Sequence, residues 1–134
     1  MCAKVDTTIT MKLHHCAYTI VKGYSHIIED FAKSLGAKVV WEGADYGREI
    51  TLEFPNKFCI QFSEIKTTPI KSVYKKETHL AFSSSNPHND VLRIVKWFES
   101  KGIRTETGKW SDTAYWIDCP DVFCNFCVEV VDVR

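Results

Sequence analysis

The amino-acid sequence predicts an α+β fold in which two βαβββ modules pair, with their mixed sheets curled around a shared cleft. Length and composition favour a single globular domain, because the chain has 134 residues, of which 45% are hydrophobic and 25% charged. Along it, one strand-like run, one amphipathic helix and three further strand-like runs follow each other twice. Matching motifs lie 64 to 68 residues apart, which indicates an internal repeat.

The first module is expected over residues 11–65, and the patternless residues 1–10 before it are expected to form a flexible arm. The module opens with a strand-like run at 13–21. A helix is expected over 25–36, because apolar residues share one helical stripe between a serine N-cap and a terminal glycine. Turn residues then separate three more strand-like runs, at 37–43, 48–54 and 57–65.

The second module is expected over residues 77–134, after a polar and basic linker at 66–76. It opens with a strand-like run at 78–85. Asn86-Pro87 is a helix-start signal, and a glycine ends the apolar stripe that follows it. Three strand-like runs come last, at 103–108, 113–118 and 123–133.

The repeat is visible in the motifs as well as in the order of elements. His15-Cys-Ala near the start of the first module matches His79-Leu-Ala in the second. In the closing strands, Gln61 between two apolar residues matches Glu129 between two apolar residues. Each module is too small to bury its own sheet, so the two must pair.

Charge and hydropathy exclude several function classes. Seventeen basic and seventeen acidic residues give no formal net charge, so there is no basic excess to bind a run of nucleic-acid phosphates. No apolar run is long enough to span a bilayer and no signal peptide opens the sequence, which predicts a cytoplasmic protein without a membrane partner. Cys124 and Cys127 lie three apart in a strand-like run and would point to opposite faces, so a zinc or redox site is not expected there.

Strand alternation places four polar side chains on the sheet faces that carry no helix. In the opening strands of the two modules, His15 and His79 alternate with residues that face the helix. In the closing strands, Gln61 and Glu129 occupy corresponding positions. Two imidazoles, one amide and one carboxylate at equivalent places of two modules suggest a metal site.

These motifs resemble the vicinal oxygen chelate superfamily, which includes glyoxalase I, methylmalonyl-CoA epimerase, extradiol dioxygenases and bleomycin-resistance proteins. Its opening signature is present as Leu13-His14-His15-Cys16-Ala17, and its second-module signature as Thr78-His79-Leu80-Ala81-Phe82. Its closing pattern is altered, because Asp118-Cys119-Pro120-Asp121 lacks the usual glycine and Val122-Phe123-Cys124 is inserted. The resemblance covers nearly the whole chain and leaves Glu129 in register.

By position, the resemblance implies one divalent metal ion per site, held by His15, Gln61, His79 and Glu129, a set closest to the epimerases and bacterial glyoxalases. Nickel, cobalt, manganese and zinc all accept such ligands. The implied enzyme is a lyase or isomerase that stabilises the enediolate of a small 2-oxo or 2-hydroxy acyl compound or thioester. Glu129 would also move the proton.

Several alternatives stay open at this point. Asp45 and Glu49 lie where the epimerases keep a second acid or base, and the sequence favours neither over the other. The protein could instead be a metal-free binding protein that sequesters a small molecule, as bleomycin-resistance proteins do, or a thiol-transfer resistance enzyme of the fosfomycin type. The second of these is disfavoured, because the resemblance to those enzymes implies a site of three metal ligands rather than four. A homodimer is expected, with modules paired within one chain or across two.

Overall fold

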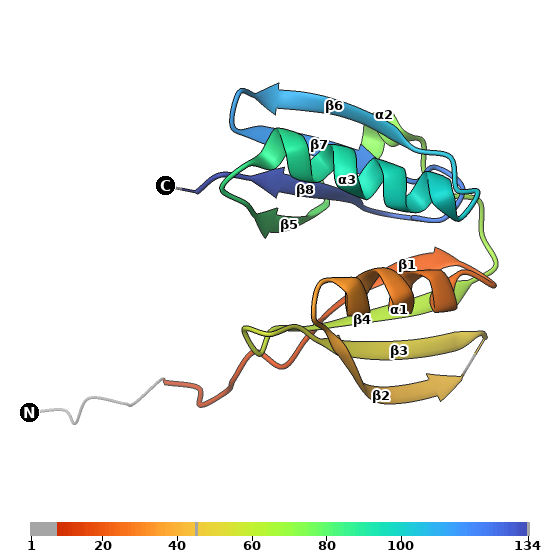
Figure 1. The fold of residues 1–134 in the computed structure, drawn as a ribbon. Coiled ribbons are helices and arrows are strands. Elements are labelled where there is room, and N and C mark those ends of the chain that lie inside the picture. Colours follow the sequence, from red (N-terminus) through yellow and green to blue (C-terminus); the bar gives the residue numbers. More distant parts are fainter. Residues whose placement is uncertain (1–7, 45, 134) are drawn as a thin grey trace, which may run out of the picture.

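The computed structural model describes residues 8–44 and 46–133 and contains two four-stranded mixed sheets, one for each module (Figure 1). It confirms the predicted α+β fold of two βαβββ modules. Residues 1–7, which make up most of the arm predicted to be flexible, and Asp45, a candidate acid or base, lie outside the described residues. No described helix is long and apolar enough to cross a membrane.

The first module consists of one helix and four strands: β1 (Cys16–Val21), α1 (Ser25–Ser34), β2 (Lys38–Ala44), β3 (Arg48–Glu53) and β4 (Cys59–Ile65). The strand order is β1-β4-β3-β2. β1 and β4 run parallel, whereas β3 is antiparallel to both of its neighbours. Helix α1 forms because its apolar residues share one stripe, and it buries Ile28, Phe31 and Ala32 against the sheet.

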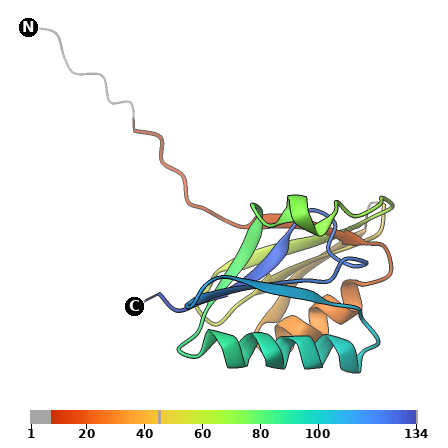
Figure 2. The same ribbon diagram turned by 90° about the horizontal axis from the view of Figure 1, so that it is seen from above.

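The second module repeats this arrangement with β5 (His79–Ser83), α3 (Pro87–Ser100), β6 (Glu106–Ser111), β7 (Ala114–Asp118) and β8 (Cys127–Val131). Its strand order is β5-β8-β7-β6, and its first and last strands are again parallel. A short helix, α2 (Ser72–Lys75), lies between the modules, in the segment read from the sequence as a polar linker. α1 and α3 lie on the same side of the molecule (Figure 2).

Several strands begin later than the sequence predicts, and β1 and β8 are the two that bear on the site. β1 begins at Cys16 rather than at residue 13, and the described residues before it run away from the two sheets as an extended arm (Figures 1 and 2). β8 begins at Cys127 rather than at residue 123. β8 begins late because the residues just before it turn back and form hydrogen bonds with β1 instead of continuing the strand.

This turn, at residues 119–126, ties the second module to the first. The N–H of Val21 donates to the Val122 carbonyl at 2.9 Å, and the N–H of Cys124 donates to the Thr19 carbonyl at 3.0 Å. The residues that the sequence shows as an insertion thus cover part of the free edge of β1. They fix how the two modules of one chain are arranged.

The helix-covered faces of the two sheets meet in one core. The rings of Tyr18 and Phe62 in the first module lie 4.9 and 5.8 Å from that of Phe126 in the second, measured between centroids. Phe54 and Phe82 make a similar contact at 5.7 Å. Because side chains alternate along a strand, the helix-free face of each sheet points away from this shared core. These two helix-free faces are called the outer faces below.

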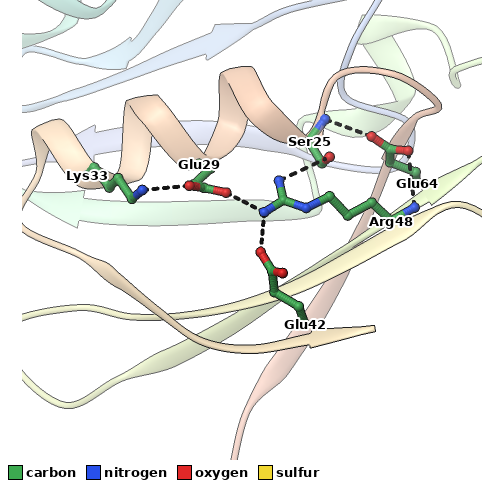
Figure 3. A network of polar contacts seen from close by, with 6 residues as sticks. All are labelled: Ser25, Glu29, Lys33, Glu42, Arg48 and Glu64. Atoms are coloured by element: carbon green, nitrogen blue, oxygen red, sulfur yellow. Dashed lines mark hydrogen bonds and ion pairs between the residues drawn. The ribbon is translucent and has the colours of Figure 1, made fainter. Parts of the chain in front are cut away.

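A polar network joins α1 to its sheet (Figure 3). Arg48 on β3 reaches Glu29 on α1 at 2.5 Å and also contacts Glu42 on β2. Glu64 on β4 accepts hydrogen bonds from the backbone N–H groups of Ser25 and Arg48, at 3.0 and 3.2 Å. The network lies on the helix side of the sheet, so it supports the fold and lies apart from the predicted metal ligands.

Candidate metal centre

His79 and Glu129 form a pair on the outer face of the second module. They lie on the neighbouring strands β5 and β8, whose register places Ala81 beside Glu129 and His79 beside Cys127. The Nε2 atom of His79 is 3.8 Å from Oε1 of Glu129. The His79 side chain is 34% exposed and the Glu129 side chain 15%, so the pair is partly shielded yet open to a ligand.

A backbone carbonyl sets the direction of the His79 ring. Its Nδ1 atom lies 2.9 Å from the carbonyl oxygen of Lys76, just after α2. Since a carbonyl only accepts hydrogen bonds, Nδ1 carries a proton, and in the neutral imidazole Nε2 then has the lone pair. The Trp110 ring packs against the imidazole at 5.0 Å between centroids. This is the tautomer and support that histidine ligands of metals usually have.

Gln61 and Glu49 form a second pair, on the outer face of the first module. The register of β3 and β4 places Thr51 beside Gln61 and Glu49 beside Ser63. The Nε2 atom of Gln61 donates to Oε2 of Glu49 at 3.4 Å. Because this bond uses the amide nitrogen, the amide oxygen is the atom left to bind a metal.

His15 lies at the edge of the same outer face. It is the residue before β1, in which Ala17 pairs with Gln61. It is exposed, and its Nδ1 atom lies 2.8 Å from Nδ1 of His14, so one ring donates and the other accepts. Its place in the chain therefore lets it share a surface with Gln61.

Within one chain the four predicted ligands do not all come together. His79 and Glu129 meet, but no group of three or more His, Cys, Asp or Glu side chains in the described part of the chain could hold a metal ion. His15 therefore does not join them. The physical reason is that the two outer faces belong to different sheets and both point away from the common core. The assignment of all four residues to one ion stays a prediction.

The donor atoms themselves fit a divalent ion. Imidazole nitrogen and carboxylate oxygen bind such ions at about 2.0–2.2 Å, so two ligands of one ion lie about 3.0–3.7 Å apart. The 3.8 Å between His79 and Glu129 is close to this range and needs only a small side-chain rotation. The outer face of the second module thus offers two ligands nearly in place, and Gln61 offers a third donor on the other module.

Comparison with solved structures places this arrangement among known folds, although no family model and no curated protein matches the sequence. The FosX fosfomycin resistance protein from Listeria monocytogenes, solved with Mn(II) and sulfate, has a TM-score of 0.59 at 12% identity, over 94% of this chain and 93% of that one. A possible glyoxalase from Bacillus cereus has a TM-score of 0.57 at 16% identity, over 91% and 99%. A glyoxylase/bleomycin resistance protein/dioxygenase domain from Frankia sp. EAN1pec has a TM-score of 0.56 at 16% identity, over 94% of both chains. The chain has the vicinal oxygen chelate fold.

Sequence reasoning missed two buried charged residues of this vicinal oxygen chelate fold, Lys75 and Asp118. Their Nζ and Oδ1 atoms are 2.8 Å apart, and both side chains are almost fully buried. Lys75 stands in a run of linker lysines, where a solvated side chain is the ordinary expectation. The available signal was Asp118, an acid at the end of an apolar strand, because a buried carboxylate needs a partner.

The cysteine pair near the end of the chain is not arranged as a thiolate site. Cys124 lies in the turn before β8 and Cys127 begins that strand, and both are buried. Burial, with a smaller effect from the charge of Asp118, raises the pKa of Cys127 to about 11. Burial also raises the pKa of Cys124. Both thiols therefore stay protonated near neutral pH. A protonated thiol is a poor metal ligand and forms disulfides slowly.

An open groove of about 1110 Å³ runs between the two modules of the vicinal oxygen chelate fold. Apolar side chains of the helix-covered faces line it, among them Tyr18, Leu80, Phe82 and Trp97. Of the predicted site residues that the structure describes, only His79 reaches this groove. The groove therefore meets the outer-face pairs at His79 alone and offers a mainly apolar surface to a small molecule.

Proposed function

We propose that the protein is a metal-dependent lyase or isomerase of the glyoxalase and epimerase type, acting on a small 2-oxo or 2-hydroxy acyl compound or thioester. The observation that carries the proposal is the His79–Glu129 pair, in which Nε2 of a fixed imidazole lies 3.8 Å from a carboxylate oxygen. A protein of the same fold, FosX from Listeria monocytogenes, was solved with Mn(II). This supports a divalent ion as the cofactor.

A second copy of the chain would complete the site. The turn at 119–126 holds the modules of one chain with their helix-covered faces together, so each outer face carries only half of the donor set. His15 and Gln61 of one copy would then face His79 and Glu129 of the other. A twofold symmetric homodimer would contain two such sites.

The exposed apolar side chains of one copy support such a dimer. Ile9, Met11 and Leu13 on the arm before β1 are 75%, 79% and 78% exposed. Trp41 on β2 and Trp110 on β6 are also exposed. Three large apolar side chains exposed within five residues of one arm favour an interaction surface there, and a second copy is the occupant that would also complete the metal site.

Each site residue has a distinct part in the proposed reaction. A divalent ion would supply the positive charge that stabilises the anion formed when a proton leaves the carbon beside a carbonyl. Glu129 would accept that proton and return it to the product. Glu49 binds the amide nitrogen of Gln61 and so fixes which end of that amide faces the ion. Asp45 remains the other candidate for a second acid or base.

A complementation experiment tests the shared site without knowledge of the substrate. One variant carries His15→Ala and Gln61→Ala, and the other carries His79→Ala and Glu129→Ala, so each removes one half of the donor set. We expect neither variant alone to bind Mn(II), while an exchanged equal mixture regains about a quarter of the wild-type sites, because half of the dimers are mixed and each of these has one intact site. A mixture that binds no Mn(II) would contradict a site shared between chains.

The groove between the modules favours a rival function, that of a metal-free protein which sequesters a small apolar molecule. Equilibrium dialysis against Mn(II), Co(II), Ni(II) and Zn(II) separates the two. About one tightly bound ion per chain supports the enzyme, and none supports sequestration. The metal-loaded protein is then assayed with hemithioacetals and acyl thioesters. Turnover of fosfomycin with a thiol, and of neither other class, would favour the resistance-enzyme alternative.

A further inference from the structure

We propose that the buried ion pair between Lys75 and Asp118 is a positioning device for His79. It fixes the segment after α2, whose Lys76 carbonyl holds the Nδ1–H of His79, so that Nε2 is presented beside Glu129. This inference rests on the proposed function where metal binding is concerned. Its first step, the orientation of the His79 ring, concerns the metal-free protein and can be measured by itself.

The ion pair is anchored on both of its charged ends. The Lys75 side chain is 0% exposed and the Asp118 side chain 1%, with Nζ and Oδ1 2.8 Å apart. The same Nζ donates to the Phe123 carbonyl at 2.7 Å. The Ser72 hydroxyl donates to Oδ2 of Asp118. Charges buried so completely are stable only with such partners, so α2 cannot leave the sheet without exposing two unpaired charges.

Backbone hydrogen bonds fasten the segment on either side of the ion pair. The N–H of Ile70 donates to the Cys124 carbonyl at 2.9 Å, and the N–H of Cys127 donates to the Thr78 carbonyl at 3.0 Å. These bonds join residues 70–78 to the turn that precedes β8 and to β8 itself. The segment is therefore held against the module that carries His79 and Glu129.

Lys76 transmits this restraint to the imidazole. It follows Lys75 directly, and its Nζ atom lies over the Trp116 ring, 4.4 Å from the centroid. The Trp116 ring itself lies across Gly108, where an added Cβ would come within 2.8 Å of the indole. With its neighbour and its own side chain both held, Lys76 directs its carbonyl at Nδ1 of His79, 2.9 Å away.

The His79 tautomer gives a direct test in the metal-free protein. Nitrogen-15 NMR of the histidine rings, at about pH 8 where imidazole is neutral, reports which ring nitrogen carries the proton. We expect wild-type His79 to be protonated at Nδ1. Asp118→Asn, which removes one charge at constant size, should shift the ring toward a mixture with the Nε2–H form. Ser72→Ala, which removes a single hydroxyl contact and keeps the ion pair, should give a smaller shift in the same direction.

Glu64→Gln is the matched control, since it also removes a buried carboxylate, but from the helix side of the other module. It should lower the melting temperature without changing the His79 tautomer. If folded Asp118→Asn and Ser72→Ala both keep the wild-type ring signals, the ion pair does not position His79. If Asp118→Asn does not fold, Ser72→Ala is the deciding variant, because it removes the hydrogen bond that holds the Asp118 carboxylate in place, and unchanged ring signals in it would overturn the positioning role.

Mn(II) affinity tests the consequence for the proposed site. Loss of an outer support of a histidine ligand usually weakens metal binding about 10–100-fold, so Asp118→Asn should raise the Mn(II) dissociation constant at least tenfold. Glu64→Gln should leave it within about twofold of wild type, because Glu64 touches neither outer face. An unchanged constant in Asp118→Asn would overturn the link to metal binding. If wild type binds no Mn(II) while the tautomer shift is seen, the proposed function fails and the positioning role stands.

Discussion

The Glu64 carboxylate on β4 accepts a hydrogen bond from the backbone N–H of Ser25, in the first turn of α1, at 3.0 Å (Figure 3). The backbone N–H of Arg48 donates to its other oxygen at 3.2 Å. Burial alone would raise the pKa of Glu64, but the hydrogen bonds from Ser25, Arg48 and Gly23 outweigh it and hold the pKa below the ordinary 4.5. A strand residue thus fills the capping role at this helix start, where the N-cap position, Tyr24, makes no side-chain bond.

Glu64→Gln should therefore destabilise the protein at neutral pH and change its acid response. We expect a loss of about 1.5–3 kcal/mol in the free energy of unfolding at pH 7, the range for hydrogen bonds to a charged group. Because the folded-state pKa is lowered, this contribution is present above pH 4.5 and is lost as the pH falls through the folded-state value. Urea unfolding from pH 7 to pH 3 should show a shallower loss of stability in the variant.

The control for this series is Glu106→Gln, which alters an exposed ion pair with Arg104. Exposed pairs contribute about 0–1 kcal/mol, so this variant should follow the wild-type pH curve closely. Parallel curves for wild type and Glu64→Gln would show that the Glu64 carboxylate is not stabilised by folding.

The described cysteines should divide into two reactivity classes. Burial, followed by the charge of Asp118, raises the pKa of Cys119 far above its usual range, and burial raises the pKa of Cys124 and Cys127 as well. Cys16 and Cys59 are only half-buried. A short iodoacetamide pulse at about pH 8, read by mass spectrometry of peptides, should modify the half-buried pair and spare the buried three, because the thiolate is the reactive form.

The same pulse in guanidinium is the control, since unfolding should make all five of these thiols reactive. Modification of Cys127 in the native protein at the rate of Cys59 would contradict the prediction. It would mean that the segment carrying α2 opens readily and leaves Cys127 exposed.

Strand faces were predictable from the sequence because the period of two is a property of the backbone. Alternation placed Gln61, Glu129 and His79 on helix-free faces, and the register of the two sheets agrees. It also placed Glu49 on that face of the first module, next to Ser63 and bonded to Gln61. These assignments need only neighbours within one module, whose strands lie close in sequence.

The remaining features depend on partners that sequence patterns do not reveal. The burial of Lys75 depends on Asp118, which comes from a different element far along the chain. The late start of β8 depends on an edge of β1 that accepts the turn at 119–126. Whether His15 meets His79 depends on how two sheets pack, which alternation within a strand cannot determine. Tertiary packing therefore sets the parts of the candidate site that the motifs left open.

The apolar arm before β1 should contribute to dimer stability. Replacing Ile9, Met11 and Leu13 together by serine should raise the dimer dissociation constant at least tenfold, since burying one such side chain is worth about 1.5–3 kcal/mol. Sedimentation velocity over a dilution series measures the change. Leu92→Ser is the control, because Leu92 is exposed on α3 and away from the arm. Equal dimer dissociation constants for wild type and the triple variant would show that the arm is not part of the interface.

Glu129→Gln should retain much of the metal and lose most of the lyase or isomerase activity. An amide oxygen can still coordinate, as we propose for Gln61, so the ion need not leave. The amide has no basic oxygen to accept the substrate proton, and a positioned general base usually contributes about 10²–10⁴-fold to the rate. Metal content and turnover are measured on the same samples, with the substrate that the screen identifies.

His79→Ala is the comparison variant for Glu129→Gln. This change removes the Nε2 donor, and alanine has no atom that can replace it as a ligand. Metal and activity should therefore be lost together. A variant that loses activity while it keeps the ion, beside one that loses both, separates proton transfer from coordination. If Glu129→Gln turns over at the wild-type rate with metal bound, Glu129 is a ligand only. The base would then have to be Asp45 or Glu49, and Glu49→Gln should show the loss of rate expected for Glu129.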